Sequence, residues 1–209
     1  IVAITGTKGK TSTAEIVNAI IEEAGYKTAL AGTLRFKVGD EEERNLYKMT
    51  IPGRFFVQRF LRRAVNAKCD WVVIEVTSEG ARQFRHKFIN FDALIFTNLS
   101  PEHIESHGSF ENYKNAKISI ARALANSQKR PRIIIANTDS EYASEFLAVD
   151  AETKTTYSLK DALPYTLEKD STTFNFMGSQ IRAHLSGAFN LSNMLAGISF
   201  ARAINISPE

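Results

Sequence analysis

Residues 1–13 read IVAITGTKGKTST, and the order of residue types in this stretch predicts how the chain begins to fold. The apolar run at its start is typical of a buried parallel strand. Gly6 and Gly9 then allow a tight turn whose backbone amides can point at one anion. From residue 10 to residue 24 apolar side chains recur at helical spacing, and Gly25 is a natural helix end. A strand, a glycine-rich turn and a helix in this order predict a phosphate-binding loop.

The residue types in this turn fit a nucleotide triphosphate. Lys10 is placed to reach the outer phosphates of ATP, and the Thr11 hydroxyl to bind Mg²⁺. The full Walker pattern has a glycine where Ile4 or Thr5 stands, so this loop is a shorter variant. A strand-to-helix turn without a ligand is the alternative, but strand, glycines, Gly-Lys-Thr and helix all coincide here. The predicted ATP-binding residues of the loop are Gly6, Thr7, Lys8, Gly9, Lys10, Thr11 and Ser12.

The rest of the chain alternates between short apolar runs and segments with helical spacing, which predicts an α/β fold of the P-loop NTPase kind. We expect a mostly parallel sheet flanked by helices, with ligands outside the carboxyl ends of its strands. Two segments, 35–49 and 155–185, instead predict antiparallel strands, and they form the small antiparallel β excursion of this fold. The expected strands span 1–5, 28–31, 71–75, 93–96 and 133–137, and the expected helices 10–24, 53–67, 110–124 and 189–204.

The helix expected over 53–67 has two distinct faces. Its basic residues, Arg59, Arg62 and Arg63, are predicted to be solvated, and nucleic acid is not an expected partner. The side chains predicted to face the core are Phe56, Phe60, Leu61, Ala64 and Val65.

The composition is that of one globular domain. The chain has 209 residues, a formal net charge of +3 and a single cysteine, Cys69, so a disulfide within the chain is excluded. We expect a cytoplasmic monomer without a membrane partner, because no long apolar span or signal sequence is present. The chain starts inside a strand and ends directly after a helical pattern. We therefore expect residues 1–209 to be one ATP-binding domain cut from a longer protein.

Polar residues that follow the next strands are candidates for a metal site. Glu75 ends the strand over 71–74, where P-loop enzymes hold magnesium. His103 and His107 lie in a loop after the following strand and are expected to face the same crevice. Magnesium prefers oxygen ligands, so the residue types alone leave a metal role for either histidine open. Lys117 on its own is an ordinary, solvated helix lysine.

Several motifs together resemble the central, ATP-binding domain of the Mur ligases, cytoplasmic enzymes that add amino acids to a peptidoglycan precursor. The pattern is most similar to that of the UDP-N-acetylmuramoyl-tripeptide synthetases, which add the third amino acid. The matching segments occur in the family's order over nearly the whole chain: Gly6–Thr13, Glu75–Ser78, Thr97–Gly108, Tyr113–Lys117 and Leu185–Ala196.

The resemblance implies a role for each matching residue. Glu75 and His103 would bind Mg²⁺ with Thr11, and Lys117 would be carbamylated and hold a second magnesium ion. Lys10, Glu75, His103 and Lys117 would be the catalytic set. Asn190 and Asn193 would contact the adenine end of ATP. Four residues would contact the UDP-N-acetylmuramoyl-peptide, namely Thr50, Ser78, Gln83 and Arg85.

The implied reaction is an ATP-dependent amide ligation through an acyl phosphate, with an amino acid as the second substrate. The sequence does not specify which amino acid is added. One departure from the family is Glu79, where relatives often carry histidine. Two alternatives are a folylpolyglutamate or cyanophycin synthetase, against which the 78–85 stretch argues, and a nucleotide-binding module that does not ligate.

Overall fold

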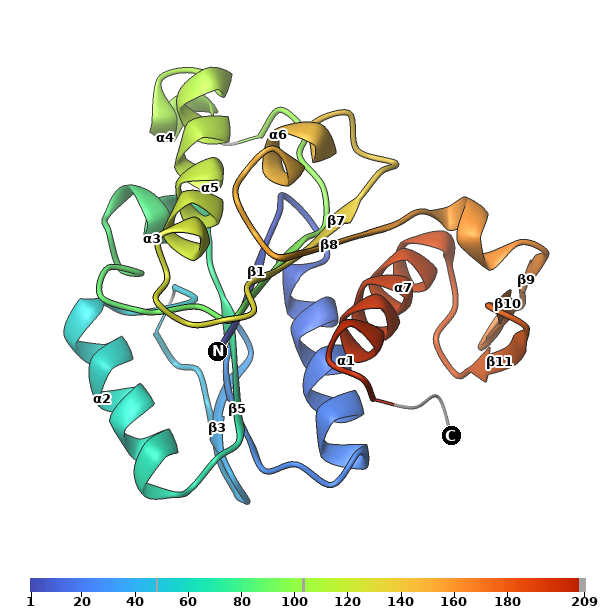
Figure 1. The fold of residues 1–209 in the computed structure, drawn as a ribbon, viewed down its shortest axis with the longest axis horizontal. Coiled ribbons are helices and arrows are strands. Elements are labelled where there is room, and N and C mark those ends of the chain that lie inside the picture. Colours follow the sequence, from blue (N-terminus) through green and yellow to red (C-terminus); the bar gives the residue numbers. More distant parts are fainter. Residues whose placement is uncertain (48, 103, 207–209) are drawn as a thin grey trace.

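The computed structural model describes residues 1–47, 49–102 and 104–206, which form an α/β fold with two sheets (Figure 1). The main sheet has the strand order β4-β3-β2-β5-β1-β6-β7-β8. Six strands are parallel, and the β3–β4 hairpin adds two antiparallel strands at one edge. The predicted fold class is confirmed. The strands of this sheet are β1 (Val2–Thr5), β2 (Thr28–Ala31), β3 (Arg35–Val38), β4 (Glu41–Arg44), β5 (Trp71–Glu75), β6 (Ala93–Phe96), β7 (Ile133–Asn137) and β8 (Thr153–Tyr157).

Helices cover both faces of this sheet. The longer helices are α1 (Lys10–Glu23), α2 (Arg54–Asn66), α5 (Phe110–Ala125) and α7 (Ala188–Ala203), all close to the predicted ranges. In Figure 1, α1 and α7 lie side by side on one face, and α2 and α5 lie on the other. Three short helices, α3 (Ser78–Arg82), α4 (Ile104–His107) and α6 (Ala143–Leu147), lie in segments expected to be loops. Helices of four or five residues are too short to show a helical period.

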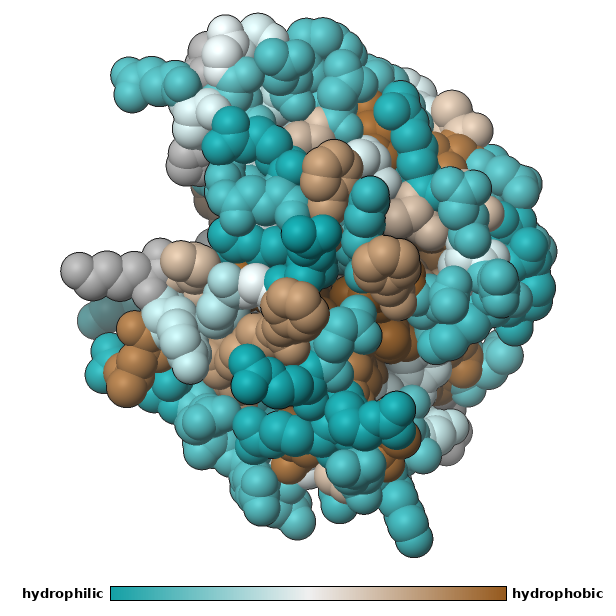
Figure 2. All heavy atoms as spheres, turned by 90° about the vertical axis from the view of Figure 1, so that its left-hand side faces the viewer, coloured by the Kyte–Doolittle hydropathy of each residue, from teal (hydrophilic) through white to brown (hydrophobic). Residues whose placement is uncertain are grey.

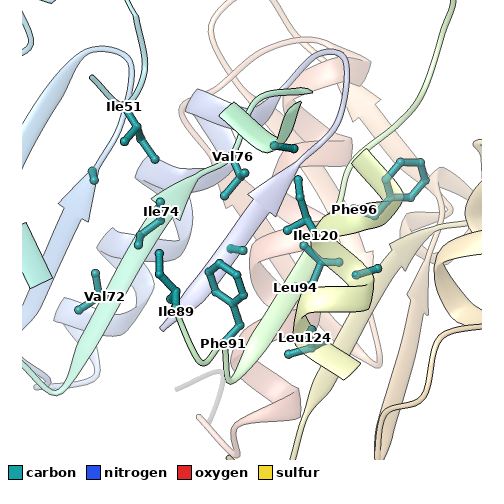
Figure 3. Packing of buried hydrophobic residues seen from close by; sticks show 14 of the residues in the cluster. Ile51, Val72, Ile74, Val76, Ile89, Phe91, Leu94, Phe96, Ile120 and Leu124 are labelled. Atoms are coloured by element: carbon teal, nitrogen blue, oxygen red, sulfur yellow. The ribbon is translucent and has the colours of Figure 1, made fainter. Parts of the chain in front are cut away.

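The central strands are apolar throughout because each faces two cores. In β5, Val72 and Ile74 point into the core beneath α2 and α5, whereas Val73 points into the core beneath α1 and α7. Figure 3 shows the first core, where Ile74, Phe91 and Leu94 pack together. Alternating apolar contacts on both faces fix the register of these strands.

Helix α2 follows its predicted pattern except at one position. Phe60 and Ala64 are buried, but Val65, which was expected to face the core, is 63% exposed. Val57 takes part in the buried stripe instead and is 2% exposed. Residues 57, 60 and 64 lie on one line of the helix, and Val65 is rotated about 100° away from it. Seen from the side of α2 and α3, the surface is mostly hydrophilic with scattered apolar side chains (Figure 2).

The segment over 155–185 divides between the two sheets. Its first residues belong to β8, which pairs in parallel with β7, so the prediction of an antiparallel strand is wrong there. Strand β8 lies at the sheet edge with alternately exposed residues, and this alternation resembles that of an antiparallel strand. The remainder forms the predicted antiparallel sheet from β9 (Tyr165–Leu167), β10 (Thr172–Phe176) and β11 (Ser179–Ala183). A 3₁₀ turn, Leu159–Ala162, connects the two sheets.

Across the described residues, none of the helices is both long enough and apolar enough to cross a bilayer.

Candidate active site

The turn between β1 and α1 is tightly packed against two neighbouring side chains. Gly6 and Gly9 both have positive φ, at 155° and 81°. A Cβ atom at Gly6 would lie 1.9 Å from Thr97 Oγ1, and one at Gly9 would lie 2.3 Å from Asn193 Oδ1. Only glycine fits at either position, because both the backbone angle and the space exclude a side chain. The turn between β1 and α1 is therefore a loop that packs closely against Thr97 and Asn193 and leads into the N-terminus of α1.

The end of β6 holds this loop in place from one side. The Thr7 amide donates to the Asn98 carbonyl at 2.8 Å, and the Lys8 amide donates to Asn98 Oδ1 at 2.9 Å. The Thr97 hydroxyl donates to the Lys8 carbonyl at 2.7 Å. Hydrogen bonds from a neighbouring strand end preorganise the loop, so little ordering remains to be done when an anion binds.

Two lysines meet at the carbonyl of Gly6. Lys10 Nζ donates to this oxygen at 3.0 Å and to the Thr7 carbonyl at 2.9 Å, and Lys117 Nζ donates to it at 2.6 Å. Lys117 is 1% exposed, so the expectation of a solvated helix lysine is wrong. Burial lowers the pKa of Lys10, and it lowers the pKa of Lys117 well below its usual value, with the charge of Lys10 as a further cause. Burial thus disfavours the charged form of Lys117 relative to an exposed lysine.

Glu75 lies on the other side of the loop. Its Oε2 accepts from the Thr11 hydroxyl and from the Thr33 hydroxyl, both at 3.0 Å, and its Oε1 accepts from the Thr33 amide at 2.8 Å. The side chain is 1% exposed, and burial raises its pKa although these hydrogen bonds lower it. Thr11 and Glu75 present oxygen atoms side by side, which are the ligands that magnesium prefers. Among the described residues, His, Cys, Asp and Glu nowhere gather in a group of three able to hold a metal ion.

Of the two candidate histidines, the structure describes only His107. His103 lies outside the described residues. His107 does not face the crevice as expected, because it is 7% exposed and its Nε2 lies 3.1 Å from Ser78 Oγ. Residues 104–107 form the short helix α4, which places His107 between Ser78 of α3 and Tyr113 of α5.

The residues expected at the peptide substrate lie close to Glu75 or to one another. Thr50 Oγ1 lies 3.0 Å from Thr33 Oγ1, which is itself bonded to Glu75. Gln83 Oε1 accepts two bonds from Arg85, at 3.1 Å and 2.6 Å, and Arg85 also donates to the Ile51 carbonyl. Ser78, the fourth of these residues, is turned toward His107.

Glu79, the residue that departs from the family, does not present a free negative charge. It forms an ion pair with Arg82 at 2.9 Å and accepts a hydrogen bond from Gln83. Arg82 lowers the pKa of this carboxyl group. The charge of Glu79 is thereby balanced within α3 itself.

A groove runs beside the phosphate loop toward α7. Its volume is about 640 Å³. Asn193 lies beneath the loop, where its Oδ1 accepts from the Thr13 hydroxyl at 3.2 Å, and Asn190 Nδ2 donates to the Ser186 carbonyl at 2.8 Å. Lys8, which was proposed from the sequence, lines the groove together with polar residues that were not, among them Asn98, Asn137, Asp139 and Ser192. Asn137 ends β7 as Glu75 ends β5, so its position was the signal that could have identified it.

Known proteins resemble this chain along its whole length. Residues 4–201 match the Mur ligase middle domain family. The UDP-N-acetylmuramoyl-L-alanyl-D-glutamate–2,6-diaminopimelate ligase of Syntrophomonas wolfei is 32% identical over 219 residues, which cover 100% of this chain and 44% of that protein. This chain therefore spans less than half the length of that relative.

Solved structures share the fold. A UDP-N-acetylmuramoyl-L-alanyl-D-glutamate–2,6-diaminopimelate ligase matches with a TM-score of 0.79 at 22% identity, over 99% of this chain and 43% of the other. A complex of FPGS with AMPPCP matches with a TM-score of 0.61 at 16% identity, over 100% of this chain and 60% of the other. At these identities the likeness concerns the fold alone. The family match covers almost every residue, and on this evidence the chain belongs to the Mur ligase family, as a middle domain.

Proposed function

We propose that this chain is the ATP-binding domain of a cytoplasmic ligase that joins an amino acid to a UDP-N-acetylmuramoyl-peptide in peptidoglycan precursor synthesis. The observation that carries the proposal is the pair of lysines, the partly buried Lys10 and the buried Lys117, that meet at the carbonyl of Gly6 in the phosphate loop. The relatives named above are ligases of this class. The substrates, the activity and the surrounding domains of the whole protein are part of the proposal.

ATP would bind along the phosphate loop, residues 6–12, with its phosphates at the N-terminus of α1. Lys10 would exchange its two carbonyl partners for the outer phosphates, which carry full negative charge. The groove beside the loop is lined at its α7 side by Phe189 and Ser192, so the nucleoside would extend along it toward the N-terminal turn of α7, the segment that contains Asn190 and Asn193.

Magnesium would be held by Thr11 and Glu75, with His103 as a further ligand. When bound, the ion neutralises charge on the phosphates and on the phosphoryl group that is transferred. Thr33 holds both oxygens of Glu75 toward the loop, so this carboxylate is already oriented. A cation beside Glu75 would also offset the cost of burying its negative charge.

Lys117 would be carbamylated in the active protein. Its pKa is lowered by burial, and with the described residues it forms no ion pair, so the amine lone pair is available. Once the ammonium has given up one proton, the neutral nitrogen attacks carbon dioxide. A C–N bond forms as one C=O π bond breaks, a second proton leaves the nitrogen, and the product is an anionic carbamate. Such a group could hold a second magnesium ion, which a lysine ammonium cannot do.

The peptide substrate would lie on the Glu75 side of the loop, against Thr50, Ser78, Gln83 and Arg85. Its carboxylate oxygen attacks the γ-phosphorus of ATP, and the bond to the β-phosphate oxygen breaks to release ADP. The amine of the amino acid then attacks the acyl carbon and loses a proton, and inorganic phosphate leaves. Lys10 would stabilise the negative charge in the first step.

The experiment uses the full-length protein and the variant Lys10→Ala, with the exposed lysine variant Lys154→Ala as the matched control. We expect Mg²⁺-dependent binding of an ATP analogue in calorimetry, and a turnover that falls about 10³-fold in Lys10→Ala only. Normal turnover in Lys10→Ala would contradict the phosphate-loop assignment.

The substrate class is tested by comparing UDP-N-acetylmuramoyl-L-alanyl-D-glutamate with a folate, each offered with a panel of amino acids that includes 2,6-diaminopimelate. Amide formation with the folate alone would favour the FPGS class, and tight ATP binding without any amide product would favour a nucleotide-binding module. Removing dissolved carbon dioxide should lower the rate and added bicarbonate should restore it, if Lys117 is carbamylated.

A further inference from the structure

His107 lies between the two parts of the proposed site. On one side its Nε2 is 3.1 Å from Ser78 Oγ, at the start of α3. On the other side its ring packs edge-on against the Tyr113 ring in α5, with 5.3 Å between the centroids and an interplanar angle of 73°. All three side chains are nearly inaccessible to solvent, so water does not compete with these contacts.

Tyr113 in turn contacts the phosphate loop. Its hydroxyl lies 2.9 Å from Thr7 Oγ1, which also accepts a hydrogen bond from the Ser100 amide at 3.0 Å. The same ring lies 4.8 Å from Lys117 Nζ. Ser78, His107, Tyr113 and Thr7 thus form a continuous buried chain of contacts, which we call the His107 brace.

We propose that His107 is a positioning residue that holds the peptide-binding segment and the phosphate loop in register. The proposal rests on the proposed function, which assigns Ser78 to the peptide substrate and Thr7 to ATP. The two segments follow different strands, β5 and β1, and phosphoryl transfer needs the reacting atoms at about 3–3.5 Å. His107 contacts Ser78 directly and reaches the phosphate loop through Tyr113, so it sets the separation of the two segments before either ligand binds.

The contacts of the His107 side chain with Ser78 and with Tyr113 can be removed separately. His107→Phe keeps an aromatic ring against Tyr113 but has no nitrogen to bond to Ser78. His107→Gln offers an amide nitrogen near the position of Nε2 but has no ring to pack against Tyr113. Each variant therefore breaks one end of the brace and leaves the other.

The full-length protein is tested with two readouts: the KM for UDP-N-acetylmuramoyl-L-alanyl-D-glutamate and the Kd for MgADP by calorimetry. We expect His107→Phe to raise this KM about tenfold and to leave the MgADP Kd within about twofold of wild type. We expect the reverse for His107→Gln, with an MgADP Kd raised about threefold and a KM within about twofold. A general loss of packing would move both quantities in both variants, and this result would overturn the proposal.

Neighbouring variants test whether His107 acts through its two contacts. Ser78→Ala should raise the KM as His107→Phe does, and the double variant should be no worse than either single one. Effects that multiply in the double variant would mean that His107 does not act through Ser78. Tyr113→Phe should weaken MgADP as His107→Gln does. Ile120→Val, in the same helix and fully buried, should lower the melting temperature and change neither affinity.

The failure of the proposed function is a distinct result. A wild-type protein that binds MgADP but forms no amide would refute the ligase assignment. The MgADP measurements would still decide on the brace: weaker binding in both His107→Gln and Tyr113→Phe supports it, and unchanged binding in either overturns it. A wild-type protein that binds no MgADP would refute the phosphate-loop assignment and the brace together.

Discussion

Two buried basic residues lie at opposite ends of the parallel strands: Lys117 near the carboxyl ends and Arg132 near the amino ends. Their surroundings differ in the charges they contain. Arg132 is 4% exposed and donates to Asp150 at 2.7 Å and to Glu152 at 2.7 Å and 3.1 Å. It also donates to the Ala125 carbonyl at the end of α5. Lys117 is 1% exposed and meets a carbonyl oxygen, an aromatic ring and a second lysine. The carboxylates raise the pKa of Arg132, whereas burial lowers that of Lys117.

This contrast fits a structural role for Arg132 and the functional role that we propose for Lys117. Arg132 joins the starts of β7 and β8 to the end of α5, and its charge is matched there. Lys117 lies at the carboxyl ends of the parallel strands, beside the phosphate loop, where burial disfavours its charged form more than the charge of Glu102 offsets. A destabilised group of this kind, placed at a ligand site, is characteristic of active centres.

The largest expected effect comes from replacing Lys117 with an apolar residue of similar length. Lys117→Met should lower the ligation rate about 10³-fold, because the methionine side chain cannot form the proposed carbamate. The same variant should raise the free energy of unfolding by about 1 kcal/mol, since a buried, unmatched amine is removed. Steady-state kinetics and urea unfolding measure the two quantities. A variant that lost both activity and stability would mean that Lys117 is a structural cation like Arg132.

For Arg132 we expect the converse, a loss of stability without a loss of activity. Arg132→Met should lower the melting temperature by about 5 °C and leave the turnover number within about twofold of wild type. The matched control is Arg130→Met, which removes a half-exposed arginine that also pairs with Glu152 at 3.2 Å, and its effect should be smaller. Equal melting temperatures for the two variants would show that the buried hydrogen bonds of Arg132 stabilise the fold no more than the ion pair of Arg130 does.

Alkaline pH should reduce the cost of burying Lys117. Because its folded-state pKa lies well below its usual 10.5, the unfolded chain binds more protons in the interval between these values. Stability therefore rises with pH across this interval. The difference in unfolding free energy between Lys117→Met and wild type should shrink as pH rises from 7 toward 10.5. A difference that stayed constant would indicate a charge already matched in the fold.

The smallest expected effect is the loss of stability at acid pH that comes from the ion pair between Arg132 and Glu152. Arg132 lowers the pKa of Glu152 to about 2 from the usual 4.5. The stabilising contribution of Glu152 is present above pH 4.5 and is lost as pH falls toward 2. Wild type should therefore lose more stability than Arg132→Met over this range. Parallel acid-unfolding curves for the two proteins would argue against the pairing.

Much of the fold was predictable because local residue patterns determine it. The strands over 28–31 and 93–96 begin and end at the predicted residues, since both are continuous apolar runs covered on both faces. The parallel pairing of strand β8 and the short helices α3, α4 and α6 were not predicted. An edge strand and a helix of one turn depend on their neighbours more than on their own pattern.

The candidate site was predictable in part for the same reason. The phosphate loop and Glu75 occupy strand ends, and parallel strands bring such ends to one edge of a sheet. The burial of Lys117 was not predictable from the residues alone, because helical spacing does not specify what covers a helix face. The contact between His107 and Ser78 joins residues 29 positions apart, and the turn of α4 decides it.

By itself, the sequence determined the strand–loop–helix unit over 1–24, the α/β class and the residue types that can bind a phosphate. These follow from short-range patterns, since backbone freedom and apolar periodicity act within a few residues. Only the tertiary structure decided that Lys10 and Lys117 share one carbonyl, that Glu79 is neutralised by Arg82, and that His107 connects α3 to α5. Burial and pairing arise from segments distant in the chain, and the pKa of each group depends on both.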